Sequence, residues 1–413
     1  MALVRSFAFA LALTLCFSAL TGCVSHRLYN QEPDQYILTL TAEAASTEST
    51  ESAGAIEYDL AIIEFDDHGT FWKRDQLEAA VALIELRNAE SPGGVLVIPF
   101  VHGWKNNADP EDPDGDLARF RRQLANIAAS QVGDDEKPDR VVGVFFGWRG
   151  ATSRVWLQEQ LTFWDRRRTA ERLVSLSMRE AMFRIMSTAR QNPRSKCFVV
   201  GHSMGGMIVG KTLAPSLTTL LLAGGEEGVL MPADLVVLLN PALDALASWQ
   251  FVDLLKRSGA RLELRDNDGG ARPAPGPIIV SITSESDRAT GTAYPLGRTV
   301  SSLMTAFRGD HEDPQPSQRY LATRAEGHVD ALISHRAWVG DDGEVVLERV
   351  PDAWNDTPFW IIRVSREISD GHSDLNNPRL AILIDRLTRM NDVYAAGVDT
   401  WMMTGDASTA DER

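Results

Sequence analysis

Short apolar runs alternate with segments of helical character along most of this 413-residue chain. Each run is four to eight residues long, which is the length of a strand buried on both faces of a sheet. We expect strands at 58–65, 95–101, 141–146, 197–200, 235–239, 278–283 and 359–364. Strands separated by helices pair in parallel, because each connection crosses back to the edge where the next strand begins. The chain therefore predicts an α/β fold, with helices on both faces of a mostly parallel sheet.

Helical periodicity fills the segments between these runs. We expect helices at 74–88, 117–129 and 249–257. Two further stretches place apolar side chains on one helical face: Leu173, Leu176, Phe183 and Met186 in the first, and Leu380, Leu383, Leu387 and Met390 in the second. A helix that covers a sheet needs such a face.

The run 197–200 ends abruptly in Gly-His-Ser-Met-Gly at 201–205. Such a run, followed by glycines and a new apolar segment, predicts a strand that turns sharply into a helix, with Ser203 at the apex. The turn is strained, and side chains at Gly201 and Gly205 would collide with the neighbouring strand or helix. The pattern resembles the nucleophile elbow of the α/β-hydrolase superfamily, and the resemblance covers about residues 95–395.

This resemblance implies a serine, an acid and a histidine in that order along the chain. Asp287 follows the strand 278–283 and is the expected acid, with Asp244, after the preceding strand, as its rival. His372 follows the strand 359–364 and is the expected base, with His328 as the substitute. A serine hydroxyl needs a base to accept its proton, and the acid orients that base.

Donors for an oxyanion complete such a site. The resemblance implies one donor in the backbone N–H of the residue after the serine, here Met204, and a second in the loop after the strand 95–101. There, His102-Gly103-Trp104 resembles the His-Gly motif of the family, so the Trp104 N–H is the expected second donor. Gly103 would let the backbone approach a substrate, and His102 is expected to make structural hydrogen bonds.

Residues 288–355 are the least regular part of the chain. Glycine and proline are scattered through them, and 343–350 is a candidate hairpin. We expect this segment to be an insertion before the last strand that lies over the active face and could serve as a lid.

The N-terminus has the pattern of an export signal. A positively charged start is followed by an apolar core and then by Leu-Thr-Gly-Cys at 20–23, which resembles the lipoprotein box of bacteria. We therefore expect a signal peptide at 1–22 and a lipid on Cys23. Val24 is similar to the outer-membrane sorting pattern of Gram-negative lipoproteins. An ordinary signal peptide with an incidental Cys23 is the alternative.

The residues after Cys23 lack apolar periodicity. Residues 42–54 are rich in Ala, Ser, Thr and Glu, so we expect 23–54 to be a flexible tether, with 36–40 as a candidate edge strand. The hydrolase domain is expected at 55–400, and a polar, disordered tail at 401–413.

Charge excludes some partners. The formal net charge of −16 disfavours nucleic acid and adhesion to anionic lipid, since both need a basic surface. A run of three arginines at 166–168 could contact phosphate, but a solvated face is the default for such a run. The resemblance implies no metal and no organic cofactor.

The sequence thus predicts a serine hydrolase of esterase or lipase type, anchored by lipid to the bacterial cell envelope. The expected substrates are small-molecule or lipid esters, cleaved through an acyl-enzyme. Because a fold does not fix its chemistry, peptidase, thioesterase and acyltransferase activities stay open. The alternative from another class is a catalytically inactive lipoprotein of hydrolase fold that binds or scaffolds other molecules.

Overall fold

The computed structural model describes residues 26–42, 56–130, 138–151, 156–224, 228–259, 261–302, 305–307 and 316–391. The predicted signal peptide (1–22), Cys23 and the predicted tail (401–413) lie outside these residues.

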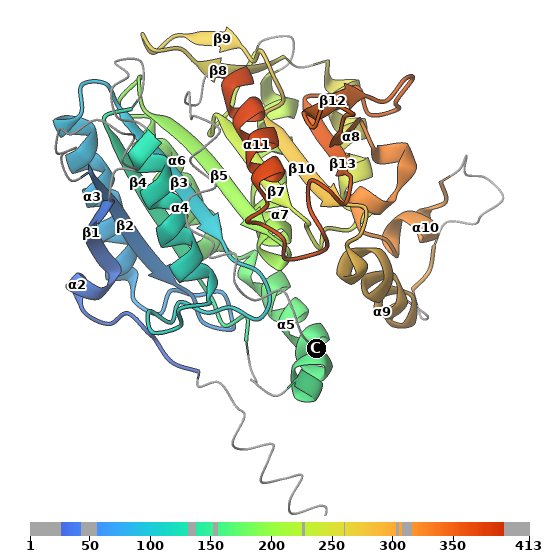
Figure 1. The fold of residues 1–413 in the computed structure, drawn as a ribbon, viewed down its shortest axis with the longest axis horizontal. Coiled ribbons are helices and arrows are strands. Elements are labelled where there is room, and N and C mark those ends of the chain that lie inside the picture. Colours follow the sequence, from blue (N-terminus) through green and yellow to red (C-terminus); the bar gives the residue numbers. More distant parts are fainter. Residues whose placement is uncertain are drawn as a thin grey trace, which may run out of the picture.

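One large sheet runs through the described part of the chain (Figure 1). The spatial order of its ten strands is β1 (Ile37–Ala42), β2 (Ile56–Glu64), β4 (Arg140–Gly147), β3 (Val95–Val101), β5 (Lys196–His202), β7 (Leu235–Leu239), β10 (Ile279–Ser284), β13 (Phe359–Val364), β11 (His335–Val339) and β12 (Val345–Arg349). All neighbours from β2 to β11 pair in parallel, and the outer strands β1 and β12 are antiparallel. The sheet is therefore mostly parallel, as predicted.

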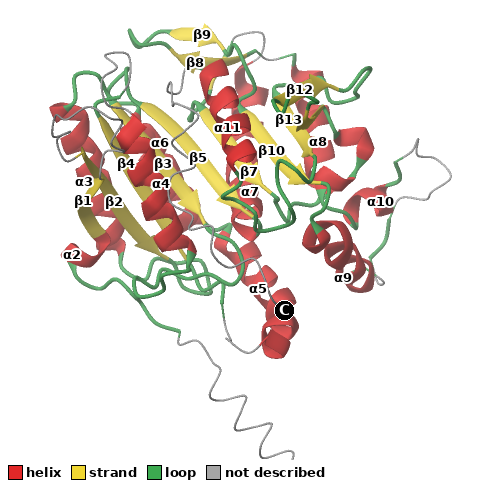
Figure 2. Cartoon of the chain, viewed as in Figure 1, coloured by secondary structure: helices red, strands yellow, loops and turns green. Residues whose placement is uncertain are grey.

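Helices cover both faces of this sheet (Figure 2). The longer ones are α3 (Arg74–Glu90), α4 (Asp116–Ser130), α5 (Trp156–Leu173), α6 (Leu176–Ala189), α7 (Met204–Gly224), α8 (Ala245–Ser258) and α11 (Pro378–Met390). In Figure 2, α4 and α11 lie in front of the sheet, and α3, α6, α7 and α8 lie behind it. Each face has its own apolar core, with Leu124 and Leu383 fully buried in one and Met182 and Ile208 in the other. Because both faces are covered, every residue of β3 and β5 is buried, which explains apolar runs without alternation.

Shorter elements connect this framework. They are α2 (Pro33–Tyr36), β6 (Val229–Leu230), β8 (Leu262–Arg265), β9 (Ala271–Pro273), η1 (Ala289–Ala293), α9 (Tyr294–Ser301), α10 (Gln318–Ala322), η2 (Glu326–His328) and η3 (Asp330–Leu332). The strands β6, β8 and β9 form a second, small sheet that the sequence did not predict, since two to four residues are too few to show an alternation.

The helix that follows Ser203 is long and apolar. By length and composition, Met204–Ala223 could cross a membrane. In the structure this helix, α7, packs against β5, β7, α5 and α8. Its apolar composition is therefore accounted for by the core that it joins.

The predicted helical face through Leu173 and Leu176 is wrong at Leu176. The chain forms two helices here, because Ser175 turns the backbone and its side chain accepts the Met178 N–H at the start of α6. Leu176 consequently lies in an exposed first turn, with 79% of its surface accessible, whereas Leu173 and Met186 are fully buried. The predicted face near the C-terminus is present in α11, where Leu380, Leu383 and Leu387 are buried.

Residues 30–42 differ from the predicted flexible tether. Asn30 is fully buried, and its side chain donates hydrogen bonds to Glu64 Oε1 at 3.0 Å and to the Ala108 carbonyl at 2.9 Å. Seven residues further on, β1 begins and pairs with β2 along its whole length, near the candidate edge strand at 36–40. The segment is ordered because its polar groups have specific partners on the domain, which composition alone does not reveal. The rest of the predicted tether, 23–25 and 43–54, lies outside the described residues.

The segment 288–355 also differs from the predicted cover. Residues 335–349 form the hairpin of β11 and β12, and β11 extends the main sheet beside β13. This hairpin begins earlier than the 343–350 that the sequence suggested, and it belongs to the edge of the sheet rather than to a layer over the active face. Periodicity missed β11 because its five residues, His-Arg-Ala-Trp-Val, mix charged and apolar side chains and form no apolar run.

Candidate active site

Ser203 lies at the carboxyl edge of the sheet, in the turn between β5 and α7. Its φ angle of +57° falls in the left-handed region, which residues with a side chain rarely adopt. Surrounding backbone bonds hold it there: the Ser203 N–H donates to the Leu239 carbonyl at 2.9 Å, and the Ser203 carbonyl accepts the Ala242 N–H at 3.0 Å. This strain is of the kind that recurs at functional sites, where the surrounding structure fixes it.

Glycines make this turn possible. A Cβ on Gly205 would lie 2.0 Å from the Val101 carbonyl oxygen, and one on Gly201 would lie 2.8 Å from the Gly205 carbonyl oxygen. These are the collisions that the sequence predicted. A Cβ on Gly103 would approach the Ser203 Cβ to 2.9 Å, so the loop after β3 passes directly over the serine.

The structure brings Ser203, His372 and Asp287 together. His372 Nε2 lies 2.7 Å from Ser203 Oγ, and His372 Nδ1 lies 2.8 Å from Asp287 Oδ2. The ionised carboxylate accepts the Nδ1–H, which leaves Nε2 free to accept the serine hydroxyl proton. Three residues from separate connections, after β5, β10 and β13, therefore form one continuous chain of hydrogen bonds.

Asp287 is nearly fully buried, at 2% exposure, and it is well supplied with donors. Its Oδ1 accepts the N–H groups of Ala289 and Thr290 at 2.8 and 3.2 Å, and its Oδ2 accepts the Thr290 hydroxyl at 2.5 Å. Burial raises the pKa of this carboxyl, but the hydrogen bonds from His372 and Thr290 outweigh it, and the net shift of the pKa is downward. Asp287 thus stays ionised beside the imidazole.

The loop that carries His372 is held by two residues that the sequence analysis did not assign to it. Asn240 donates from Nδ2 to the carbonyls of Gly371 and His372 at 3.2 and 3.0 Å, and its Oδ1 accepts the Ser284 N–H at 2.9 Å. His202 Nε2 donates to the same His372 carbonyl at 3.0 Å. Burial is the main reason why the pKa of His202 falls to about 4, so this ring is neutral. The available signal was position, since both residues end strands beside the elbow.

The two expected oxyanion donors lie on either side of Ser203. Met204 is the first residue of α7, where backbone N–H groups have no partner within the helix. Trp104 follows Gly103 in the loop that passes over the serine. Among the described residues, neither the Met204 nor the Trp104 backbone N–H has a hydrogen-bond acceptor. Both are therefore available to a bound oxygen atom.

His102 fixes this loop from below. The ring is fully buried, accepts the Trp148 N–H at Nε2 at 3.0 Å, and lies 2.9 Å from the Gly103 carbonyl at Nδ1. Burial lowers the pKa of His102, in keeping with a neutral ring that donates at one nitrogen and accepts at the other. In return, the Trp148 indole N–H donates to the His102 carbonyl at 2.9 Å. These are the contacts of a residue that shapes the loop.

Neither alternative residue takes part in the Ser203–His372 contact. His328 Nε2 lies 2.9 Å from the Thr290 hydroxyl, so it supports the acid from behind. Asp244 stands at the N-cap position of α8 without a side-chain capping bond, and it accepts the Tyr294 hydroxyl at 2.5 Å and pairs with Arg298 at 3.0 Å. Asp244 is thus engaged by cations rather than by a histidine.

The arrangement suits nucleophilic chemistry. A serine hydroxyl hydrogen-bonded to an imidazole, itself oriented by a buried carboxylate, is an activated nucleophile. The free N–H groups beside it suit a developing oxyanion. Among the described residues, no group of three or more His, Cys, Asp and Glu side chains is arranged to hold a metal ion.

Comparison with known proteins adds little. No protein-family model matches the chain, and no curated protein matches its sequence. Among solved structures, TT1662 from Thermus thermophilus matches over 73% of this chain and 91% of its own, with 13% sequence identity and a TM-score of 0.29. At that level the match carries no further argument.

Proposed function

We propose that this chain has an α/β-hydrolase fold and is a serine hydrolase that cleaves carboxylic or lipid esters. The observation that carries the proposal is the hydrogen-bond chain from Ser203 through His372 to Asp287, at 2.7 and 2.8 Å, on a serine with φ of +57°. Each of these three residues lies in a different connection of the sheet, and the two hydrogen bonds link them.

In the proposed reaction, Ser203 Oγ attacks the ester carbonyl as His372 Nε2 takes the hydroxyl proton. Asp287 holds the ring in the required tautomer and stabilises the imidazolium. The N–H groups of Met204 and Trp104 donate to the oxyanion. His372 then passes the proton to the leaving alcohol, and a water molecule, activated by the same histidine, releases the acyl group from Ser203.

A serine-directed fluorophosphonate probe tests this function. The wild-type protein should become covalently labelled, and Ser203→Ala should abolish the labelling and lower kcat for p-nitrophenyl butyrate by about 10⁴-fold or more. Ser286→Ala is a matched control, because Ser286 bonds Ser284 and Asp370 but not the triad. A folded wild-type protein that stays unlabelled would instead favour the catalytically inactive binding or scaffold protein.

We also propose that the chain is exported and attached to the cell envelope through a lipid on Cys23. The support is the Leu-Thr-Gly-Cys sequence at 20–23 after an apolar core. Mass spectrometry of the N-terminal peptide of the mature protein should find acyl chains on this residue. A free thiol on Cys23 would overturn the proposal.

A further inference from the structure

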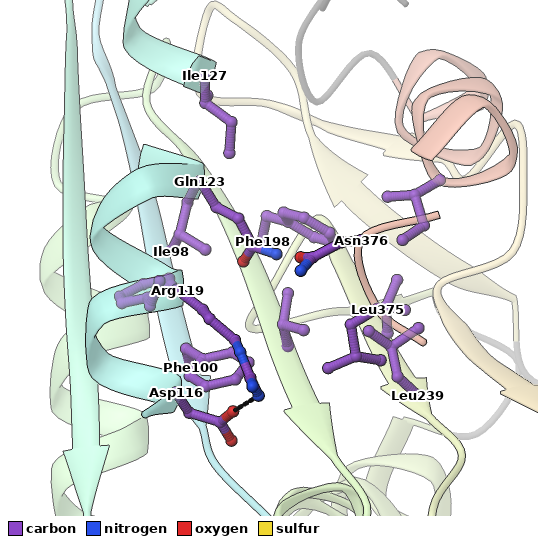
Figure 3. Close-up of a pocket in the computed structure, with 14 residues that line it drawn as sticks. Ile98, Phe100, Asp116, Arg119, Gln123, Ile127, Phe198, Leu239, Leu375 and Asn376 are labelled. Atoms are coloured by element: carbon purple, nitrogen blue, oxygen red, sulfur yellow. Dashed lines mark hydrogen bonds and ion pairs between the residues drawn. The ribbon is translucent and has the colours of Figure 1, made fainter. Parts of the chain in front are cut away.

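Two cavities of very different size flank the sheet. One lies between α4 and α11, has mostly apolar walls and holds about 30 Å³, room for one or two water molecules (Figure 3). The other holds about 720 Å³ and lies between α5 and α9. Its walls include Trp164, Arg167, Arg168 and Glu171 from α5, and Leu296 and Arg298 from α9. This second cavity, called here the α5–α9 cavity, is large enough for part of a substrate.

The α5–α9 cavity adjoins the candidate active site. Arg167 Nη1 donates to the Ala242 carbonyl at 2.8 Å, and the Ala242 N–H donates to the Ser203 carbonyl at 3.0 Å. On the same wall, the Trp104 ring packs edge-on against Phe163 of α5, with ring centroids 4.9 Å apart. Two residues, Arg167 and Ala242, therefore connect the cavity wall to the backbone of the serine.

The α9 wall of the cavity is connected to Asp287. The turn η1 begins two residues after Asp287, holds that carboxylate through Thr290, and continues directly into α9. The cavity thus lies between the loop that carries the acid and the helix that packs on the oxyanion loop.

Positive charge dominates the polar lining. Arg167, Arg168 and Arg298 line the cavity, and Lys211 lies behind it, 3.5 Å from Asp244. Among the described residues, Arg167, Arg298 and Lys211 pair with two carboxylates, Glu171 and Asp244. Arg168 interacts electrostatically with a third, Asp165. The surplus is cationic, although the whole chain carries a net charge of −16.

The buried Arg167 already bonds the Ala242 carbonyl, Asp244 and Tyr294. The guanidinium that is accessible to a ligand is that of Arg168, which is exposed and lines the cavity. The guanidinium fork fits the two oxygens of a carboxylate or a phosphate. Trp164 and Leu296 add apolar surface, which suits a short carbon chain between an anionic group and an ester. Contact with such a carbon chain would also explain why Leu296, an apolar side chain, is 67% exposed.

We propose that the α5–α9 cavity binds an anionic group of the substrate, a carboxylate or a phosphate, while Ser203 attacks an ester in the same molecule. The proposal rests on the esterase function proposed above and names its substrate class as anionic esters. It also assigns a role to the arginine run at 166–168, in which Arg166 and Arg167 are buried rather than solvated.

Three p-nitrophenyl esters test this. Mono-p-nitrophenyl glutarate carries a carboxylate, p-nitrophenyl 4-phosphonobutanoate carries a phosphonate in place of a phosphate, and methyl p-nitrophenyl glutarate is the neutral match. The wild type should hydrolyse at least one anionic ester with a kcat/KM about 10-fold above that of the neutral ester, the scale of one charge-assisted hydrogen bond. Which anion gains more distinguishes the carboxylate from the phosphate.

Arg168→Gln should lower this anionic preference by about 10-fold, and Arg168→Lys should keep part of it. Arg168 is exposed, so its replacement does not disturb the core. The control is Arg194→Gln, which removes the same charge at an exposed residue before the amino end of β5, the far end of the strand from Ser203.

The outcomes separate the two proposals. A wild type that hydrolyses the neutral ester but shows no preference for either anion overturns the anionic site and leaves the esterase function standing. An anionic preference that Arg168→Gln leaves intact, or that Arg194→Gln removes equally, also overturns it. Absence of both fluorophosphonate labelling and hydrolysis of all three esters overturns the esterase function, and the anionic site with it.

Discussion

Asp287 and Asp244 follow neighbouring strands of one sheet and are both buried, yet their surroundings differ completely. Asp287 accepts hydrogen bonds from a histidine, a threonine and backbone N–H groups. Asp244 faces Arg167, Lys211 and Arg298. A carboxylate oriented toward an imidazole can tune a base, whereas a carboxylate surrounded by fixed cations is held as a structural counter-ion. The partners of each residue, rather than its place after a strand, decide between these roles.

Catalysis should show the largest difference between the two aspartates. Asp287→Asn keeps the size of the side chain but favours the wrong tautomer of His372, so kcat for p-nitrophenyl butyrate should fall about 10³–10⁴-fold. Asp244→Asn should lower it by less than about 10-fold, since no contact of Asp244 reaches His372. Steady-state kinetics on both variants decide this. Equal losses would make Asp244 a partner in the chemistry and erase the contrast.

The free energy of unfolding should depend more on Asp244 than on Asp287. Asp244→Ala leaves Arg167, which is 2% exposed, without its buried counter-ion, so the free energy of unfolding should drop by about 3–5 kcal/mol. Asp287→Ala removes no partner of an arginine or lysine among its described contacts, and the expected loss is smaller, about 1–3 kcal/mol. Urea unfolding of both variants measures the difference. A greater loss for Asp287→Ala would contradict the counter-ion role of Asp244.

A third carboxyl sharpens the comparison, because Glu326 is fully buried and pairs with no arginine or lysine in the described part of the chain. Burial is the main reason why its pKa rises to about 7 from an ordinary value of 4.5, while a hydrogen bond from Ser248 acts in the opposite direction. The folded state then holds this proton more tightly than the unfolded state. Its contribution to stability is complete below about pH 4.5 and is lost as the pH rises through 7.

Glu326→Gln should remove that loss. The wild type should lose up to about 3 kcal/mol of unfolding free energy between pH 4.5 and 8 relative to the variant. The aspartates act with the opposite sign. Burial raises the pKa of Asp244, but Arg167, Lys211 and Arg298 lower it further than burial raises it, so its contribution disappears as the pH falls through the folded-state pKa. Urea titrations across the pH range test this, and parallel curves for wild type and variant would rule it out.

The triad could be predicted because each of its residues lies in the connection after a strand that periodicity identifies. Parallel strands have their carboxyl ends at one edge of the sheet, so residues that follow different strands in the sequence lie close together in space. The residues that hold the triad were missed, although Asn240 and His202 also stand at strand ends, because a position after a strand does not show which atoms a side chain will contact. Asn240 and His202 act on the carbonyl of His372, and Thr290 acts on Asp287 through a turn whose shape no local pattern encodes. Their contacts exist only once the loops have folded.

Several strands of the main sheet could also be predicted from the sequence. The strands 95–101, 235–239 and 359–364 have the predicted bounds, because each is an apolar run long enough to cross a covered sheet. The full extent of the β11–β12 hairpin, its place in the main sheet and the packing of Asn30 were not predicted, since short mixed strands and isolated polar contacts leave no periodic signal. The buried arginines 166 and 167 likewise look like a solvated run until their partners, Asp67 and Asp244, are seen beside them.

The buried hydrogen bond between Asn30 and Glu64 affects how a lipid anchor would position the domain at a membrane. Glu64 ends β2 beside Gly147 of β4, at the same edge of the sheet as Ser203. The Tyr29 N–H also donates to Glu64 Oε2 at 3.0 Å, and the His26 ring packs edge-on against Trp72. With a lipid on Cys23, as we propose, the leash between the lipid and the described chain is only residues 24 and 25. A leash of that length would keep the sheet edge that carries Ser203 near the membrane and limit how far Ser203 can lie from its surface.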